Sequence, residues 1–171
     1  AAKSLLPALT RGRIDTGPRS PLNNTPAFTV GINTARNENI ILTTADTRPA
    51  STKWLECMAQ GFERGEVLIA YAGLERKGGF ANGVMRSQRL AESVRYLSAA
   101  IKGKPYRGIL ANLGFTKTVY FDNRGFDHLN MYIGEDDLFV QKIVRGASAA
   151  VVMNPHATVR ETIWGGYRPW W

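Results

Sequence analysis

The sequence contains very little cysteine and no long apolar run. Its 171 residues include one cysteine, Cys57, which excludes an internal disulfide and a cysteine-based metal cluster. A lone thiol is typical of a reducing compartment, so we expect a cytoplasmic protein. No apolar stretch approaches the ~20 residues that a membrane-spanning helix needs, and no signal-peptide pattern appears at the start.

Dense clusters of basic residues are also missing. The formal net charge is +8, but the lysines and arginines are scattered, and no nucleic-acid-binding motif is present. We therefore expect no nucleic-acid partner, while phosphorylated small molecules and acidic lipids remain admissible. Apolar residues make up 44% of the chain and charged residues 21%, which is ordinary for one globular domain of this length.

Turn-forming residues divide the chain near its start. Residues 11–26 contain three prolines and two glycines, so we assign 1–24 to a loop-rich segment and 25–171 to one domain. Within that domain, helical and strand-like patterns alternate, which predicts an α/β fold with a mostly parallel sheet flanked by helices. The expected helices lie at 25–37, from Ser51 onward, at 80–101 and from Glu135 onward. The expected strands lie at 39–45, 66–72, 109–116 and 149–153.

Two groups of carboxylates stand where such a sheet binds ligands. Asp46 follows the expected strand 39–45, and Glu135-Asp136-Asp137 follows Gly134 at the start of an expected helix. Both patterns also suit plain helix caps, because carboxylates near a helix start are stabilised by free N–H groups and the helix dipole. Together they suit another role, since one carboxylate plus substrate phosphates can hold magnesium and a second can accept a proton.

Three stretches carry a family resemblance. They are ARNENIILTTADTRPASTKWLECMAQGF, GKPYRGILANLGFTKTVYF and NRGFDHLNMYIGEDDLFVQKI. In order and spacing they resemble family 2 glycosyltransferases, especially a bacterial branch common in Bacteroidetes, over about residues 25–168. The resemblance implies a GT-A-like, Rossmann-like fold. It also implies a nucleotide-sugar donor, a divalent cation (Mg or Mn), and inverting transfer to a saccharide or lipid-linked acceptor in cell-envelope polysaccharide biosynthesis.

The resemblance also assigns roles to residues. Asp46 matches the second acid of the family's Asp-x-Asp metal motif, while Thr44 replaces the first, which leaves metal dependence open. The general base falls on Asp136, with Asp137 as the next choice and Glu135 as its motif partner. Apart from these matched motifs, we expect donor or acceptor contacts at Asp46, Arg48, Arg107 and Asn112.

Several of these residues have simpler alternatives. Arg107 also suits a surface charge, and Asn112 a structural hydrogen bond. His156 suits either a metal ligand beside Asp46 or a turn cap.

The sequence departs from the family at both ends. Residues 1–24 are too short for the family's opening strand–helix–strand unit, and the chain stops where a Gln-x-x-Arg-Trp-like motif would follow, so we expect an incomplete GT-A-like sheet. The resemblance allows for membrane association of a full-length protein at the inner face of the cell membrane, and for a homo-oligomer. Two other functions stay open, a non-catalytic polyanion- or nucleotide-binding domain and a phosphoryl-transfer enzyme.

Overall fold

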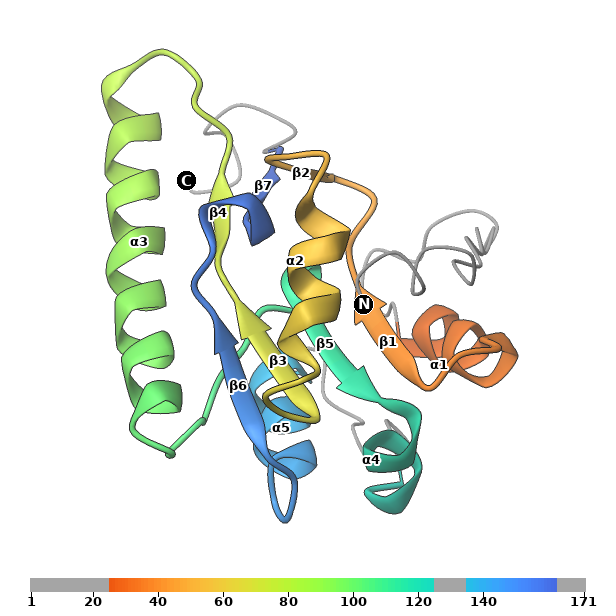
Figure 1. Ribbon diagram of the computed structural model, residues 1–171. Coiled ribbons are helices and arrows are strands. Elements are labelled where there is room, and N and C mark those ends of the chain that lie inside the picture. The colour runs from red at the N-terminus through yellow and green to blue at the C-terminus, as the bar shows by residue number, and fades with distance from the viewer. Residues whose placement is uncertain (1–24, 125–134, 163–171) are drawn as a thin grey trace.

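The computed structural model describes residues 25–124 and 135–162 (Figure 1), so the predicted loop-rich segment 1–24 lies outside the described residues. The helices are α1 (Thr25–Thr34), α2 (Trp54–Gly61), α3 (Phe80–Ile101), α4 (Lys117–Asp122) and α5 (Glu135–Ile143), with short 3-10 helices η3 (Leu110–Asn112) and η4 (Pro155–Ala157). The strands are β1 (Asn39–Leu42), β2 (Thr47–Pro49), β3 (Val67–Ala70), β4 (Ala72–Leu74), β5 (Leu113–Thr116), β6 (Ala149–Val152) and β7 (Val159–Glu161).

The strands form two mixed sheets. The larger has the order β1-β5-β3-β6, and the smaller has the order β2-β7-β4. The α/β class is confirmed, but the expectation of a mostly parallel sheet is wrong. Three of the five strand pairs are antiparallel, and only β3–β6 and β4–β7 are parallel. In the larger sheet the reason is β5, which enters between β1 and β3 in the opposite direction, and in the smaller sheet β2 runs opposite to β7.

Both faces of the larger sheet are covered by helices. The four side chains of β3 are all fully buried, and they alternate between two apolar clusters as strand geometry requires. In Figure 1, α2 lies on one face of the sheet and α5 behind it. A strand buried on both faces reads as a continuous apolar run, which is why the segment VLIA was recognisable in the sequence.

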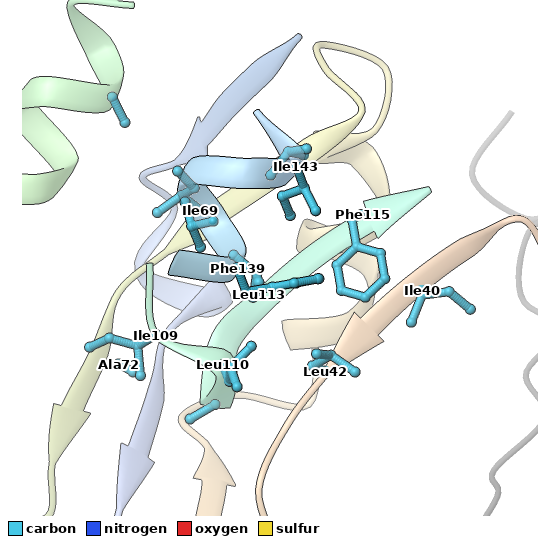
Figure 2. Packing of buried hydrophobic residues seen from close by; sticks show 14 of the residues in the cluster. Ile40, Leu42, Ile69, Ala72, Ile109, Leu110, Leu113, Phe115, Phe139 and Ile143 are labelled. Carbon is cyan, nitrogen blue, oxygen red and sulfur yellow. The ribbon is translucent and has the colours of Figure 1, made fainter. Parts of the chain in front are cut away.

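The larger core cluster lies between the sheet and helices α3, α4 and α5. Phe115 stacks on Tyr120 with ring centroids 5.8 Å apart and meets Phe139 edge-on at 5.4 Å. Figure 2 shows Phe139 and Ile143 of α5 packed against Ile69 and Leu113 of the sheet. Each such large side chain contributes about 1.5–3 kcal/mol when fully buried. This packing fixes α5, and therefore the acidic segment at its start, against the sheet.

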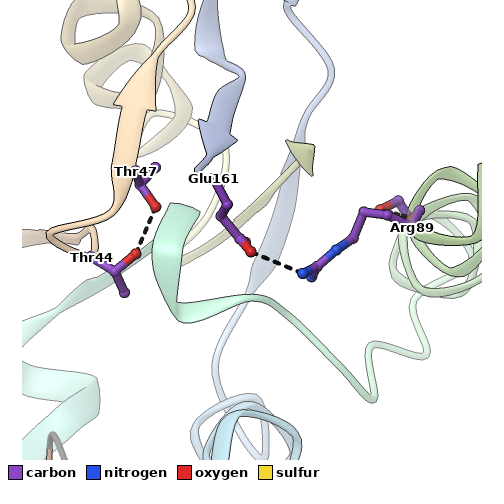
Figure 3. Close-up of polar contacts among 5 residues, drawn as sticks. Thr44, Thr47, Arg89 and Glu161 are labelled. Atoms are coloured by element: carbon purple, nitrogen blue, oxygen red, sulfur yellow. Dashed lines mark hydrogen bonds and ion pairs between the residues drawn. The ribbon is translucent and has the colours of Figure 1, made fainter. Parts of the chain in front are cut away.

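The smaller sheet is anchored to α3. Arg89 on α3 forms an ion pair with Glu161 at the end of β7, with 2.9 Å between Nη2 and Oε2 (Figure 3). Val159 and Ala72 on the same sheet are fully buried. Within the described residues, no helix has the length and apolar character needed to cross a membrane.

Candidate functional site

One edge of the larger sheet collects the carboxyl ends of three strands. β1 and β3 are both antiparallel to β5, and β3 is parallel to β6, so β1, β3 and β6 run in one direction. Beyond this edge the chain enters the smaller sheet, and η3 lies there at the amino end of β5. Ligands of open α/β sheets bind beyond the carboxyl ends of the strands. This edge is therefore the candidate site.

The helix α5 starts toward the same edge. Because α5 leads into the amino end of β6, it must run back along the sheet, away from the candidate site. Two contacts agree with this direction. Gln141, near the end of α5, donates from Nε2 to the Tyr106 carbonyl at 3.1 Å. Asp137, near the start of α5, pairs with Arg107, which is one residue closer to η3 in the sequence. The acidic start of α5 therefore points to the edge where Asp46 lies.

Asp46 lies in a turn whose backbone is firmly held. The Thr47 N–H donates to the Thr44 carbonyl at 3.1 Å, and their hydroxyls are 2.6 Å apart (Figure 3). The Thr162 N–H donates to the Asp46 carbonyl at 2.8 Å. The carboxylate itself is exposed. Since the next helix, α2, begins only at Trp54, Asp46 caps no helix, and the capping interpretation does not apply.

Arg48 lies directly opposite Arg160 across the β2–β7 pair, and both side chains are exposed. The two arginines line a pocket of about 210 Å³ together with Pro49, Ala50, Glu75 and Thr162. Glu75 Oε2 accepts a hydrogen bond from the Thr162 hydroxyl at 3.1 Å. Two guanidinium groups and one carboxylate therefore share a small recess next to the Asp46 turn.

Two of the predicted site residues meet at the start of α5. Arg107 Nε lies 3.2 Å from Asp137 Oδ1, and both side chains are about one-third exposed, 37% and 34%. Burial raises the pKa of Asp137 and nearby Glu92 adds to this, while Arg107 opposes both. The side chains of Glu135 and Asp136 lie outside the described residues. Arg107 is thus not a lone surface charge, because it forms an ion pair with Asp137.

The side chain of Asn112 is used by the fold. Its exposure is 0%, and Oδ1 accepts from Trp54 Nε1 at 3.0 Å. Its Nδ2 donates to the carbonyls of Tyr71 and Ala157, both at 2.8 Å. The amide thereby ties α2, the end of β3 and η4 together at the candidate edge. Of the two alternatives raised for Asn112, the structural one describes this arrangement.

His156 belongs to the η4 turn. Asn154 Oδ1 accepts from the His156 N–H at 2.9 Å, and His156 Nδ1 lies 3.2 Å from the Ser51 hydroxyl. The structure describes residues 25–124 and 135–162, except for the side chains of 25–28 and 135–136. Within that part of the chain, no three or more His, Cys, Asp or Glu residues form a group that could hold a metal ion. One exposed carboxylate, Asp46, still suits a magnesium or manganese ion that takes its other ligands from water and substrate phosphates.

The sequence-based prediction missed the three strands of the smaller sheet, and with β7 it missed the residues that this strand carries. β7 has three residues, and its sequence VRE shows no period. It places Arg160 opposite Arg48, and Thr162 beside Glu75. Only the pairing of distant segments reveals these neighbours, so no local signal was available.

A comparison of the sequence with models of known protein families finds no match, and a comparison with curated proteins finds no relative.

Proposed function

We propose that this chain is the catalytic core of an inverting glycosyltransferase resembling family 2, which moves a sugar from a nucleotide-sugar to an acceptor hydroxyl. One observation carries the proposal. The topology directs the Asp46 turn and the acidic start of α5 to the same edge of the larger sheet, although they are far apart in the sequence. A metal-holding carboxylate and a proton-accepting carboxylate at one edge are the equipment for this transfer.

The direction of the strands supports a GT-A-like sheet as the finer description of the fold. Three of the four strands of the larger sheet run the same way, and β1 lies at the end of the order β1-β5-β3-β6. The outer side of β1 has no strand partner among the described residues. A further strand–helix–strand unit that holds the nucleotide base would extend the sheet there.

The proposed reaction assigns one task to each group. Asp46 would hold the divalent cation, which neutralises the donor diphosphate and so stabilises the leaving group. Asp136 would take the proton from the acceptor hydroxyl as its oxygen attacks the anomeric carbon from the side opposite the nucleotide. The bond from that carbon to the diphosphate oxygen breaks, and the nucleoside diphosphate leaves with the electron pair. Configuration at the sugar carbon is therefore inverted.

The pairing of Asp137 with Arg107 supports Asp136 rather than Asp137 as the base. The Arg107 guanidinium lies 3.2 Å from Asp137 Oδ1, so this carboxylate already faces a charged group of the protein, and an acceptor hydroxyl would have to displace that group to reach it. Asp137 also packs partly against the body of the protein, being one-third exposed. We assign it to holding the start of α5 in place.

The experiment compares Asp136→Asn with Asp137→Asn in release of nucleoside diphosphate from a panel of sugar nucleotides, with and without manganese. We expect Asp136→Asn to lower transfer by at least about a hundredfold, the usual scale for loss of a general base, with donor binding unchanged. Asp137→Asn is the matched control and should retain most of the activity. Near-normal turnover by folded Asp136→Asn would contradict the proposal.

A binding domain without catalysis is the second candidate. It is favoured by the net charge of +8 and by the facing pair Arg48 and Arg160, which attract anions whatever the chemistry. It predicts that nucleotides bind but that no donor in the panel is consumed. The same panel therefore separates the two functions.

A further inference from the structure

The smaller sheet places two arginines side by side on one face. Arg48 and Arg160 are paired residues of antiparallel strands, so their side chains leave the sheet on the same side. Neither forms an ion pair with any residue that the structure describes. Like charges directly opposite each other across a strand pair destabilise a sheet. A bound anion would remove this repulsion.

The next position across the smaller sheet, beyond Arg48 and Arg160, is a glycine without a side chain. Gly73 on β4 is the partner of Arg160 on its other side. A Cβ atom on Gly73 would lie 2.8 Å from the Tyr71 hydroxyl and 2.9 Å from Tyr71 Cε1. The aromatic ring therefore occupies the space that a side chain at 73 would need. The face is bounded by an aromatic wall at one end and the arginines at the other.

The lining of the recess identifies the chemistry that it would accept. A guanidinium offers paired N–H donors that match the two oxygens of a phosphate or carboxylate group. Glu75 Oε2 already accepts from the Thr162 hydroxyl at 3.1 Å. Its carboxylate can also accept from a ligand hydroxyl, so the recess suits an oxyanion carried by a hydroxylated molecule. Glu75 weakens binding of a bare anion because their charges repel.

The size of the recess limits the ligand. Its volume is about 210 Å³, below the ~300–1,000 Å³ of pockets that enclose whole small molecules. It can hold one charged group of a larger ligand and not a nucleotide. The rest of the ligand must then extend along the surface.

The recess adjoins the candidate site. Arg48 follows Asp46 by one intervening residue, and the Thr162 N–H donates to the Asp46 carbonyl at 2.8 Å. We propose that Arg48 and Arg160 form a subsite for a phosphate or carboxylate group on the acceptor, beside the donor held at Asp46. The location on the acceptor rests on the proposed transferase function, whereas binding of the oxyanion does not.

The test measures binding without any donor. Inorganic phosphate, a hexose 1-phosphate and a hexuronic acid are titrated into the full chain and followed by calorimetry at fixed salt. If the sugar phosphate binds more tightly than the uronic acid, the natural ligand is a phosphate of a lipid-linked acceptor. If the uronic acid binds more tightly, the natural ligand is an acidic saccharide. We expect Arg48→Gln and Arg160→Gln each to weaken binding about tenfold or more, since charge-assisted bidentate contacts are lost.

Two further variants make the result decisive. Glu75→Gln should bind the anions more tightly than the unmodified chain, because it removes a like charge and keeps an oxygen that accepts from Thr162. Arg86→Gln and Arg95→Gln, exposed on α3, lower the net charge equally and should leave affinity unchanged. Three results would overturn the inference. They are an equal loss of anion affinity in these control variants, unchanged affinity in both Arg48→Gln and Arg160→Gln, and no binding of any anion at millimolar concentration.

The outcomes also separate this inference from the proposed function. If the subsite variants lose anion binding but no sugar nucleotide is ever consumed, the oxyanion site stands and the transferase proposal fails. If transfer proceeds to neutral and anionic acceptors alike, and Arg48→Gln does not change the KM for either, the transferase proposal stands and the acceptor subsite fails.

Discussion

Replacing Asn112 by alanine tests whether this residue serves the fold or a ligand. The substitution removes three hydrogen bonds at once, from Trp54 Nε1 and to the carbonyls of Tyr71 and Ala157. All of them join segments that are distant in sequence. We expect the variant to lose stability while the surface of the candidate site stays chemically unchanged.

The size of the loss follows from what each partner keeps. The Tyr71 carbonyl still accepts from the Val159 N–H at 3.3 Å, and the Trp54 ring is only partly buried, so each of these losses costs about 0.5–1.5 kcal/mol. No other donor to the Ala157 carbonyl is present among the described residues, and an unsatisfied buried carbonyl costs about 1–3 kcal/mol. The sum is about 4 kcal/mol, which is a large share of the 5–15 kcal/mol typical of a domain.

Urea denaturation and thermal melting provide the measurement. A loss of about 4 kcal/mol should lower the Tm by roughly 8–16 °C for a chain of this size. Asn112→Asp preserves shape and the bond from Trp54 but places a carboxylate against two carbonyls, so it should lose at least as much at neutral pH.

The matched control is Asn123→Ala. Asn123 makes one local bond, from Nδ2 to the Val119 carbonyl at 2.9 Å, and its loss should stay near 1 kcal/mol. If Asn112→Ala melts like the unmodified chain and changes only ligand binding, the structural role assigned to Asn112 is refuted.

Three further results are expected. Because burial raises the pKa of Asp137 above its usual 3.8, the native state holds this proton more tightly than the unfolded state. The contribution of Asp137 to the free energy of unfolding should therefore fall as the pH rises above about 4, and Asp137→Asn should remove this fall. The stability difference between the variant and the unmodified chain should thus change with pH in urea titrations, and a constant difference would contradict the shift. Asp46→Ala should abolish any manganese-dependent gain in nucleoside diphosphate binding with the Tm within a few degrees, since only its backbone carbonyl is engaged, whereas a large drop in Tm with no metal effect would return Asp46 to a structural role. Gly61→Ala should lower the free energy of unfolding by about 1–3 kcal/mol, because the new Cβ would lie 2.9 Å from Leu68 Cδ1. Gly83→Ala in helix α3 meets nothing within 4 Å and should raise it by about 0.5–1 kcal/mol. Equal urea midpoints for the two variants would refute this contrast.

Elements with a strong local signal were predictable from the sequence. The helix expected over 80–101 is α3, Phe80–Ile101, and the strand expected over 66–72 contains β3, Val67–Ala70. The first is long and the second is a continuous apolar run, so neither depended on its neighbours. The strand expected over 109–116 starts as the 3-10 turn η3, because Asn112 bonds to three distant groups there.

The direction of β5 and the whole smaller sheet could not be predicted. A strand's direction depends on its partners, and those of β5 are β1 and β3, which lie far earlier in the chain. β2, β4 and β7 have three residues each, too few to show a period. For the same reason, strand-end reasoning found Asp46 and Arg48, but it missed Arg160. Arg107 and Asp137 were each named from the sequence, although nothing in it indicated their pairing.

The strand order has a consequence for how this protein folds. No strand in either sheet pairs with its neighbour in sequence, and the nearest paired residues along the chain are Ile69 and Leu113. The smaller sheet joins Thr47 to Glu161. Because the paired residues are far apart in the sequence, long loops must close before any strand pairing can stabilise the chain. We therefore expect folding in milliseconds to seconds rather than microseconds. β1 has no partner until β5 has been synthesised, and the Asp46 turn is not fixed until β7 arrives. The candidate site is thus among the last parts of the chain to form.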